Sequence, residues 1–399
     1  MTVAPDTGSD PAPGGASRFT DEFLEGLRGE GDQRADEAVK RYFDELGMLP
    51  ADPLAAIARS GAPGLSDEEA SGTGQFVREL EPWPGWVDRG LVERGQRVFG
   101  TWGLEFVAAL WMAALPTTYA CPFGAEPLVR TARLTQNPKR RYVETGQMII
   151  DAMAPGALDP GRPGYSSVRH VRLMHAAVRH VLTHPEDLPA SRGVHVEPWD
   201  MAYGLPLNQE DLLGCLLAFS ILSIRSLGQT GVVLDDEDAE AYVHVWNLIG
   251  YQIGIRPDLL PISAADATGI ANTIFDRQRA PSDAGRELTA SAIACLQGML
   301  VLKRLRGLPA SGMRHYLGAD VADMLAVPPA DWTRRIFAAT RWFDASLNGA
   351  LRWIPGHHSL LAGVGRQLIR GFEAAEQDGG RTTFDIPDEL RSAWRVGGR

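Results

Sequence analysis

Apolar residues recur along this chain three and four positions apart, which is the spacing of one face of an α-helix. Runs of alternating β-branched residues bounded by turn dipeptides, which would predict strands, are scarce. No linker interrupts the apolar pattern between residues 19 and 399. We therefore predict an all-α protein in which residues 19–399 form a single large helical domain.

Capping residues and prolines place the ends of the predicted helices. Asn137 and Pro138 are an N-cap residue and a first-turn proline, so a helix should begin there and end before Pro155. Another helix should end before Pro116, because an interior proline removes a backbone hydrogen bond. This second helix covers residues 90–114. The other predicted helices cover residues 36–46, 167–184, 208–231, 235–255, 286–305, 331–353 and 358–375.

The charge balance narrows the choice of partners. A net charge of −11 argues against a nucleic-acid partner, because affinity for the phosphate backbone depends on an excess of lysine and arginine. The three cysteines, Cys121, Cys215 and Cys295, are far apart and form no C-x-x-C pair, so neither a disulfide framework nor a zinc knuckle is indicated. A reducing compartment fits this cysteine usage.

The two ends of the chain bear on its location. Residues 1–18 are rich in Pro, Gly, Ser and Asp and predict a disordered tail. They lack the basic and apolar regions of an export signal, so we expect a cytoplasmic protein. We expect no transmembrane segment, because no run of about 18 residues is apolar and free of charge. The aromatic and arginine-rich C-terminal third leaves peripheral membrane contact open.

His175 lies in the middle of an apolar stripe on its predicted helix. At about 100° per residue, Val171 and Leu182 fall within about 40° of it, and Arg172 and Arg179 border the stripe one turn before and one turn after. A haem iron takes a neutral imidazole, the porphyrin prefers apolar walls, and its propionates pair with arginine. The same pattern also fits a hydrogen-bonded core histidine, and spacing leaves both interpretations open.

The preceding helix carries a polar face. Arg141 and Thr145 are four residues apart and share this face, and Glu144 lies at its edge. Oxygen chemistry at a haem needs polar donors in an otherwise dry pocket. The alternative is a surface ion pair between Arg141 and Glu144, and spacing alone favours that alternative.

Other iron sites find less support. None of the nine histidines has a glutamate three residues before it, which excludes the Glu-x-x-His pairs of a di-iron bundle. His195 and Glu197 form an H-x-E, but no credible second histidine accompanies them. His180 and His184 precede the helix-ending Pro185, where histidines suit the negative end of the helix dipole.

The motif R-x-x-x-T at Arg141 and Thr145, followed thirty residues later by the histidine of R-L-M-H-A-A-V-R, resembles the latex clearing proteins and the related MpaB-type oxygenases. The former are haem b dioxygenases that cleave double bonds of polyisoprene. The resemblance covers roughly residues 90–265. It implies a globin-like helical core around haem b, His175 as axial iron ligand, and Arg141 and Thr145 in the haem pocket. Arg172 and Arg179 match the arginines flanking that histidine, and helix geometry predicts them as propionate partners.

Two features depart from that family. Latex clearing proteins can carry a lysine immediately before the threonine, whereas this chain has Glu144, which is either a base in proton transfer or the partner of Arg141. The missing export signal makes extracellular rubber a poor substrate.

We therefore expect an oxygenase that uses haem b and dioxygen or peroxide to cleave the C=C bond of a small, apolar, isoprenoid-like molecule. Its expected catalytic residues are Arg141, Glu144 and Thr145. The alternatives are a haem-dependent hydroxylase or peroxygenase, and a non-catalytic module that binds haem or a hydrophobic ligand.

Overall fold

The computed structural model describes residues 18–45, 76, 83–134, 138–187, 197–300 and 302–339, with only the backbone described at 132–134, 138–144 and 187. Every regular element in these ranges is helical, which confirms the all-α prediction. The predicted tail lies outside them except for Arg18, and the two predicted C-terminal helices lie outside them from residue 340 onward.

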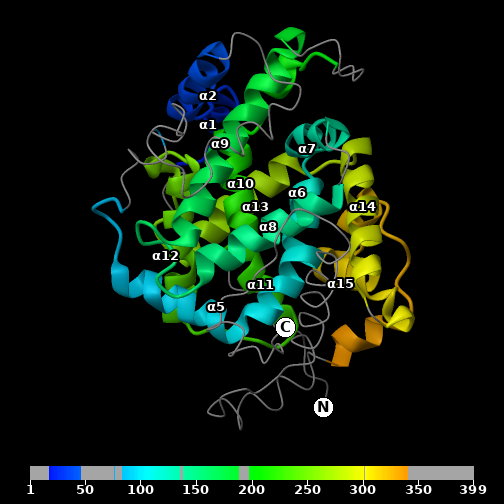
Figure 1. Ribbon diagram of the computed structural model, residues 1–399. Helices are drawn as coiled ribbons and strands as arrows, with labels where there is room; N and C mark the ends of the chain where they lie inside the picture. Colours follow the sequence, from blue (N-terminus) through cyan, green and yellow to red (C-terminus); the bar gives the residue numbers. More distant parts are fainter. Residues whose placement is uncertain are drawn as a thin grey trace.

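The helices follow one another with short connections between most neighbours (Figure 1). In chain order they are α1 (Asp21–Leu27), α2 (Gln33–Glu45), α5 (Arg89–Ala109), the π-helix η1 (Leu110–Ala114), α6 (Leu115–Tyr119), α7 (Pro122–Leu134), α8 (Pro138–Met153), α9 (Pro163–Thr183), α10 (Gln209–Phe219), α11 (Ile221–Gln229), α12 (Asp236–Ile253), α13 (Ala264–Gln278), α14 (Asp283–Met299) and α15 (Leu308–Met324).

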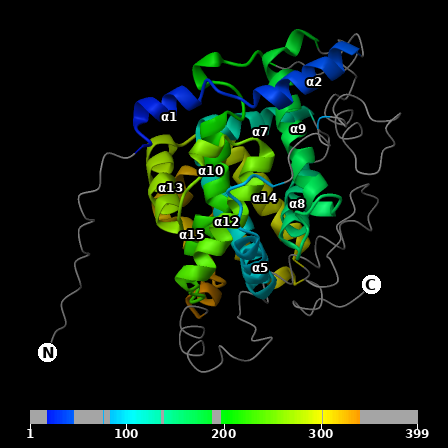
Figure 2. The same ribbon diagram turned by 90° about the vertical axis from the view of Figure 1, so that its left-hand side faces the viewer.

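The core forms around α12, which is buried along most of its length and packs along α5. These two helices approach closely at Gly95 of α5, where an added Cβ would lie 2.4 Å from the Ala241 carbonyl oxygen. Figures 1 and 2 both place α1, α2 and the end of α9 together at the top of the bundle, away from α5. The main core reaches up to α1, which contributes Leu24 and Leu27, whereas α2 and the upper part of α9 share a smaller core.

The helix that begins at Arg89 continues through Pro116, so the predicted stop before this proline was wrong. The chain passes from α5 through one π-turn, and the Leu115 amide donates to the Leu110 carbonyl oxygen five residues back. Pro116 then falls in the first turn of α6, where its missing N–H costs little. The π-turn thus accommodates the proline without ending the helix.

The single helix predicted over residues 208–231 is broken at Ser220, whose φ of −91° and ψ of −90° are not helical. The Ser220 hydroxyl donates to the Leu216 carbonyl oxygen at 2.8 Å, and the Ser223 hydroxyl donates to that of Ala218 at 3.1 Å. Such side-chain bonds compete with the helical ladder and favour a break. The predicted start at residue 208 is confirmed, because the Asn208 side chain caps α10 and accepts from the Asp211 amide at 3.0 Å.

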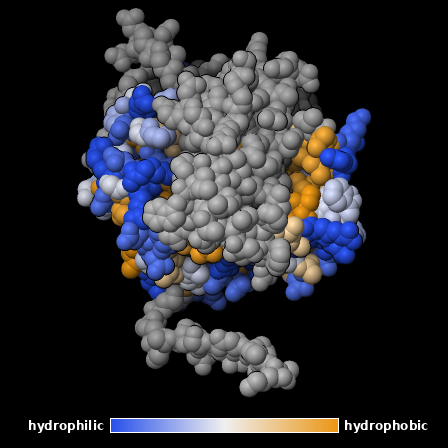
Figure 3. All heavy atoms as spheres, turned by 90° about the horizontal axis from the view of Figure 1, so that it is seen from below, coloured by the Kyte–Doolittle hydropathy of each residue, from blue (hydrophilic) through white to orange (hydrophobic). Residues whose placement is uncertain are grey.

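Two stretches, Arg89–Tyr119 and Gln209–Gln229, are long and apolar enough to cross a membrane by length and composition. Their most apolar windows are 78% and 72% buried within the protein, so core packing accounts for their hydropathy. In the view from below, the described surface is mainly hydrophilic on the left and shows an apolar area on the right (Figure 3). The large exposed apolar side chains come from separate elements and include Trp86, Ile262 and Trp332.

The close approach at Gly95 yields a stability prediction. We expect Gly95→Ala to lower the free energy of unfolding by about 1–3 kcal/mol, because its methyl group would press on the α12 backbone. Gly228→Ala in α11 is the control: no atom lies within 4 Å of its Cβ position, so alanine should stabilise that helix by up to about 1 kcal/mol. Urea denaturation measures both, and equal effects would contradict the prediction.

Candidate functional site

The candidate site is built on the hairpin of α8 and α9. Near the start of α9, a Cβ at Gly164 would lie 2.4 Å from the Asp151 carbonyl oxygen and 2.9 Å from the Ala152 Cα, so the two backbones touch there. Arg141 precedes Ala152 by eleven residues and His175 follows Gly164 by eleven. At 1.5 Å per residue, both positions lie about 16 Å from the contact. The antiparallel pairing therefore places His175 level with Arg141.

The polar residues predicted on α8 occupy this level of the hairpin or the turn next to it. Thr145 is half-buried and lies one turn nearer to the Gly164 contact than Arg141. The backbone is helical at Arg141 and Glu144, but their side chains lie outside the described residues. The structure thus brings the three predicted positions into one helical segment.

His175 lies where the apolar stripe predicted it. Val168 and Leu182 are fully buried, and Val171 packs against the main core. The imidazole is half-buried, with its Nδ1 atom shielded from solvent. His175 therefore presents an imidazole at the edge of an apolar wall, which is a suitable setting for an axial ligand.

The arginines on either side of His175 have carboxylate partners within the protein. Arg172 binds both oxygens of Asp32, with Nη2 donating to Oδ1 at 2.8 Å. Arg179 donates from Nε to Asp36 at 2.8 Å and from Nη1 to the Leu207 carbonyl oxygen at 2.9 Å. Donors of both arginines are thus directed to carboxylates and a carbonyl group of the protein, and their predicted pairing with haem propionates stays a prediction.

Glycines make room for these buried carboxylates. Gly254 ends α12 with a φ of +103°, and an added Cβ there would overlap the Asp32 carboxylate. At Gly31 an added Cβ would lie 2.8 Å from Asp36 Oδ2. Burial raises the pKa of Asp36 although Arg179 opposes the shift. The Asp32 carboxylate is thus held in a closely packed seam, whereas the Asp36 carboxylate lies at its edge and is partly exposed to solvent.

A further buried cation escaped the sequence analysis. Arg169 on α9 is fully buried, its guanidinium carbon lies 3.5 Å from the centre of the Tyr165 ring, and burial lowers its pKa. The sequence shows only an arginine in an amphipathic helix, and no local signal marks it as buried.

An aromatic cavity lies beside α8. The face of α8 that follows Thr145 contributes Gly146, Ile149 and Ile150 to it. The other lining residues come from α5, η1, α10, α11 and α12, namely Phe99, Phe106, Val107, Leu110, Trp111, Phe219, Ser223, Tyr242 and Trp246. The space at its centre measures about 10 Å³. An aromatic wall with few polar groups suits a small apolar molecule.

Side chains suited to other metal centres do not gather in the described ranges, where no group of three or more His, Cys, Asp or Glu residues is close enough to hold an ion. Burial raises the pKa of Cys121, which favours the thiol over a thiolate ligand. His180 and His184 stack at 4.8 Å at the end of α9, as predicted for histidines at a helix C-terminus. His195 lies outside the described residues.

The matched region defines the class of protein. Residues 96–345 match the family model of the catalytic domain of the ER-bound oxygenase mpaB/B' and rubber oxygenase, which is more than half of the chain. This region contains α8, α9 and the aromatic cavity, and the protein is therefore an oxygenase. The chain belongs to the MpaB and rubber oxygenase family, which confirms the resemblance seen in its motifs.

Two relatives document the similarity. A rubber oxygenase of Streptomyces sp. (strain K30) is 25% identical over 336 residues, which cover 79% of this chain and 75% of that protein. The structure of a latex clearing protein, LCP, in the closed state matches with a TM-score of 0.68 at 22% identity, covering 91% of this chain and 95% of the other. The second match shows that the two proteins share a fold.

The cavity yields a binding prediction. Phe219→Leu should enlarge the cavity. For an alkene that is too long for the wild-type cavity, the affinity should rise by about fourfold for each additional methylene group that becomes buried, because each contributes about 0.8 kcal/mol. Phe275→Leu is the control, because Phe275 is buried in the core but does not line the cavity. Fluorescence titration with alkenes of increasing size measures the effect through Trp111 and Trp246. An equal gain in both variants would contradict the assignment.

Proposed function

We propose that this oxygenase binds haem b through His175 and cleaves a C=C bond in a small, apolar, isoprenoid-like molecule. The observation that carries the proposal is the register of the α8–α9 hairpin, which places His175 level with the polar segment Arg141–Thr145. An iron ligand on one helix and polar groups on the facing one are the two parts that oxygen chemistry at a haem requires.

The described residues fit the chemistry of a haem. A haem iron needs only one imidazole from the protein, and His175 offers one at the edge of an apolar wall formed with Val168 and Leu182. Other metal sites need three or more His, Cys, Asp or Glu side chains close together, and no such group occurs in the part of the chain that the structure describes. When bound, the haem supplies the activation of dioxygen or peroxide, and the protein supplies position and access.

The residues of α8 have the types that this chemistry needs. Arg141 and Thr145 can donate hydrogen bonds, and Glu144 can accept one or hold a proton. Gly146 lines the aromatic cavity, and Thr145 precedes it directly in α8. Thr145 therefore lies between the turn of α8 at Arg141, which is level with His175, and the cavity. We assign these three residues to the polar side of the pocket, where they orient the oxygen species next to an apolar substrate.

The aromatic cavity supports a small substrate. The name of the Streptomyces relative assigns it an activity on rubber, whose repeating unit is an unsaturated isoprenoid. The cavity described here is lined mostly by aromatic and aliphatic side chains and has room at its centre for about one water-sized molecule, so any substrate requires side chains to move, and a short molecule requires less of this movement than a polymer. Its walls exclude water from the reacting double bond.

Haem binding can be tested directly. Protein expressed with a haem precursor should show a Soret band, and His175→Ala should lose it, because the single axial ligand is removed. His170→Ala is a matched control on the same helix, since its position is about 140° away around the helix axis. It should retain the wild-type haem content. Full haem content in His175→Ala would overturn the assignment.

The same preparation tests the reaction. With an apolar alkene and ¹⁸O₂, cleavage of the double bond should give two carbonyl fragments that each contain one labelled oxygen before exchange with water. A single hydroxylated product carrying one label would instead identify a hydroxylase. Failure to consume any oxidant while haem is bound would identify a haem-binding module without turnover.

A further inference from the structure

Residues 18–45, which we call the N-terminal strap, cross one end of the bundle (Figures 1 and 2). The strap precedes the region matched by the catalytic-domain model, which begins at residue 96. A row of ion pairs joins it to the body of the protein, and the pairs are Arg18–Asp266, Glu25–Arg277, Arg28–Glu210, Glu30–Arg256, Asp32–Arg172 and Asp36–Arg179. The last two of these pairs end on α9, the helix that carries His175.

These two pairs bracket the histidine. Arg172 precedes His175 by three residues and Arg179 follows it by four, so they span about 10 Å along α9. Both project within about 60° of the direction of His175 around the helix axis. Their partners, Asp32 and Asp36, lie on one short segment of the strap. Rotating or sliding α9 would therefore strain both pairs at once.

The Asp32–Arg172 pair is held in one geometry, unlike an ion pair between mobile side chains on the surface. Asp32 receives two donors from the Arg172 guanidinium, a planar fork that matches a carboxylate in one orientation. The side chains of Arg172 and Asp32 are 11% and 5% exposed, so solvent screens their attraction little. The Asp32 carboxylate is also packed against Gly254, whose lack of a side chain leaves room for it. Its position is thus determined from two sides.

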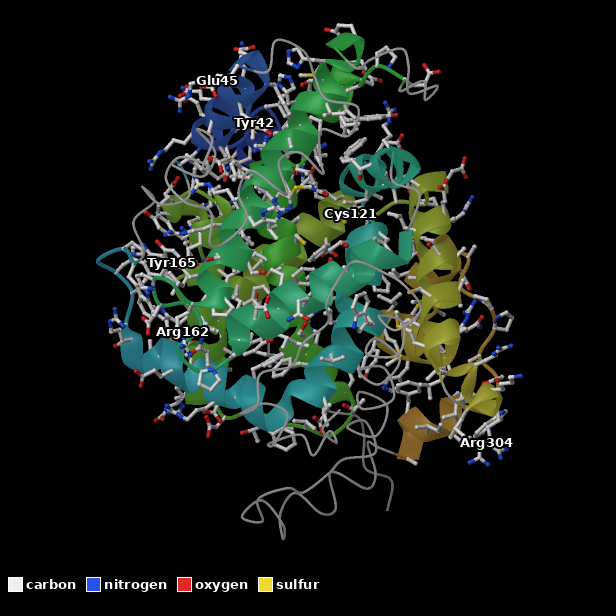
Figure 4. All side chains as sticks on the ribbon, viewed as in Figure 1. Tyr42, Glu45, Cys121, Arg162, Tyr165 and Arg304 are labelled. Atoms are coloured by element: carbon white, nitrogen blue, oxygen red, sulfur yellow. The ribbon has the colours of Figure 1, made fainter. Side chains whose placement is uncertain are left out.

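Apolar packing supports the same contact. Ala35, Ala38 and Val39 of α2 form a small core with Leu173 and Ala176 of α9, separate from the main core. Small side chains on both helices allow them to approach closely. In Figure 4, Tyr42 lies beside the upper part of α9, whereas Arg162 and Tyr165 mark its opposite end. The strap therefore holds the half of α9 that contains His175, while α8 holds its start at Gly164.

We propose that Asp32 and Asp36 are positioning residues for His175, which act through Arg172 and Arg179 to set the rotation and height of the imidazole relative to α8. This inference rests on the proposed function, because it assigns to the strap the orientation of the iron ligand. Groups behind a ligating histidine tune the metal by fixing the orientation of its ring. The strap does so through the helix backbone, from outside the catalytic-domain match.

The experiment compares Asp32→Asn and Asp36→Asn with Glu30→Gln. All three substitutions remove one charge from the strap, but Glu30 pairs with Arg256 and does not contact α9. In haem-free protein, hydrogen exchange of α9 amides around His175 should be about tenfold faster or more in Asp32→Asn, because a buried partner is lost, and faster by a smaller factor in Asp36→Asn. Glu30→Gln should leave these amides at the wild-type rate. Asp36→Asn serves as the milder variant, since the Asp36 side chain is 35% exposed.

In haem-loaded protein, both aspartate variants should shift the Soret maximum and the reduction potential, whereas Glu30→Gln should match the wild type. A merely stabilising role would lower the unfolding midpoint and leave these two properties unchanged. Wild-type spectra and potentials in both aspartate variants at full haem content would overturn the positioning role and leave the proposed function intact. A wild-type protein without a Soret band would instead overturn the proposed function itself.

Discussion

The backbone contact between α8 and α9 at Gly164 determines the geometry of the whole candidate site. With no side chain at this position, the start of α9 rests directly on the backbone of Asp151 and Ala152. A larger residue would separate the two helices and change which residues face one another further along. Because helices rise by a fixed amount per residue, this one contact sets the level of His175 relative to Arg141 eleven residues away. The site is therefore specified by a steric constraint at a distance from its chemistry.

The same helix must also satisfy several buried cations. Arg169 is fully buried and Arg172 and Arg179 nearly so, and removing a guanidinium from water without a carboxylate or an aromatic face is costly. Asp32 and Asp36 supply two of the carboxylates, and Tyr165 supplies an aromatic face. The strap is thus held against α9 because the buried arginines of α9 need carboxylate partners, and Asp32 and Asp36 of the strap provide them. The strap therefore docks through charges and also through buried apolar side chains, which are Phe19, Leu24 and Leu27 in the main core and Ala35, Ala38, Val39 and Phe43 in the smaller core with α9.

Local signals predicted much of the fold. The predicted helix starts at residues 208 and 235 are correct, and Asn208 and Asp235 cap these helices, because a capping residue acts on amides two or three positions away. The continuation through Pro116 and the break at Ser220 were missed, since the π-turn before the proline and the hydroxyl bonds of Ser220 and Ser223 leave no mark on the apolar spacing. At the site, the motif and periodicity placed His175 correctly on an apolar face. The partners of Arg172 and Arg179 were not predictable, because Asp32 and Asp36 precede them by 140 and 143 residues.

The carboxylate partners of Arg172 and Arg179 give these two residues a structural role in the protein itself. Helix geometry put them beside His175, and that remains true, but proximity to a ligand does not decide which anion a cation binds. A carboxylate fixed by the fold is present at all times, whereas a cofactor must compete for the same donors at its own binding cost. Nε and Nη2 of Arg172 both bind Asp32, so this guanidinium stabilises the contact between the strap and α9. On the facing helix, the α8 segment from Arg141 to Thr145 lies at the level of His175, which makes it the candidate source of further polar groups there.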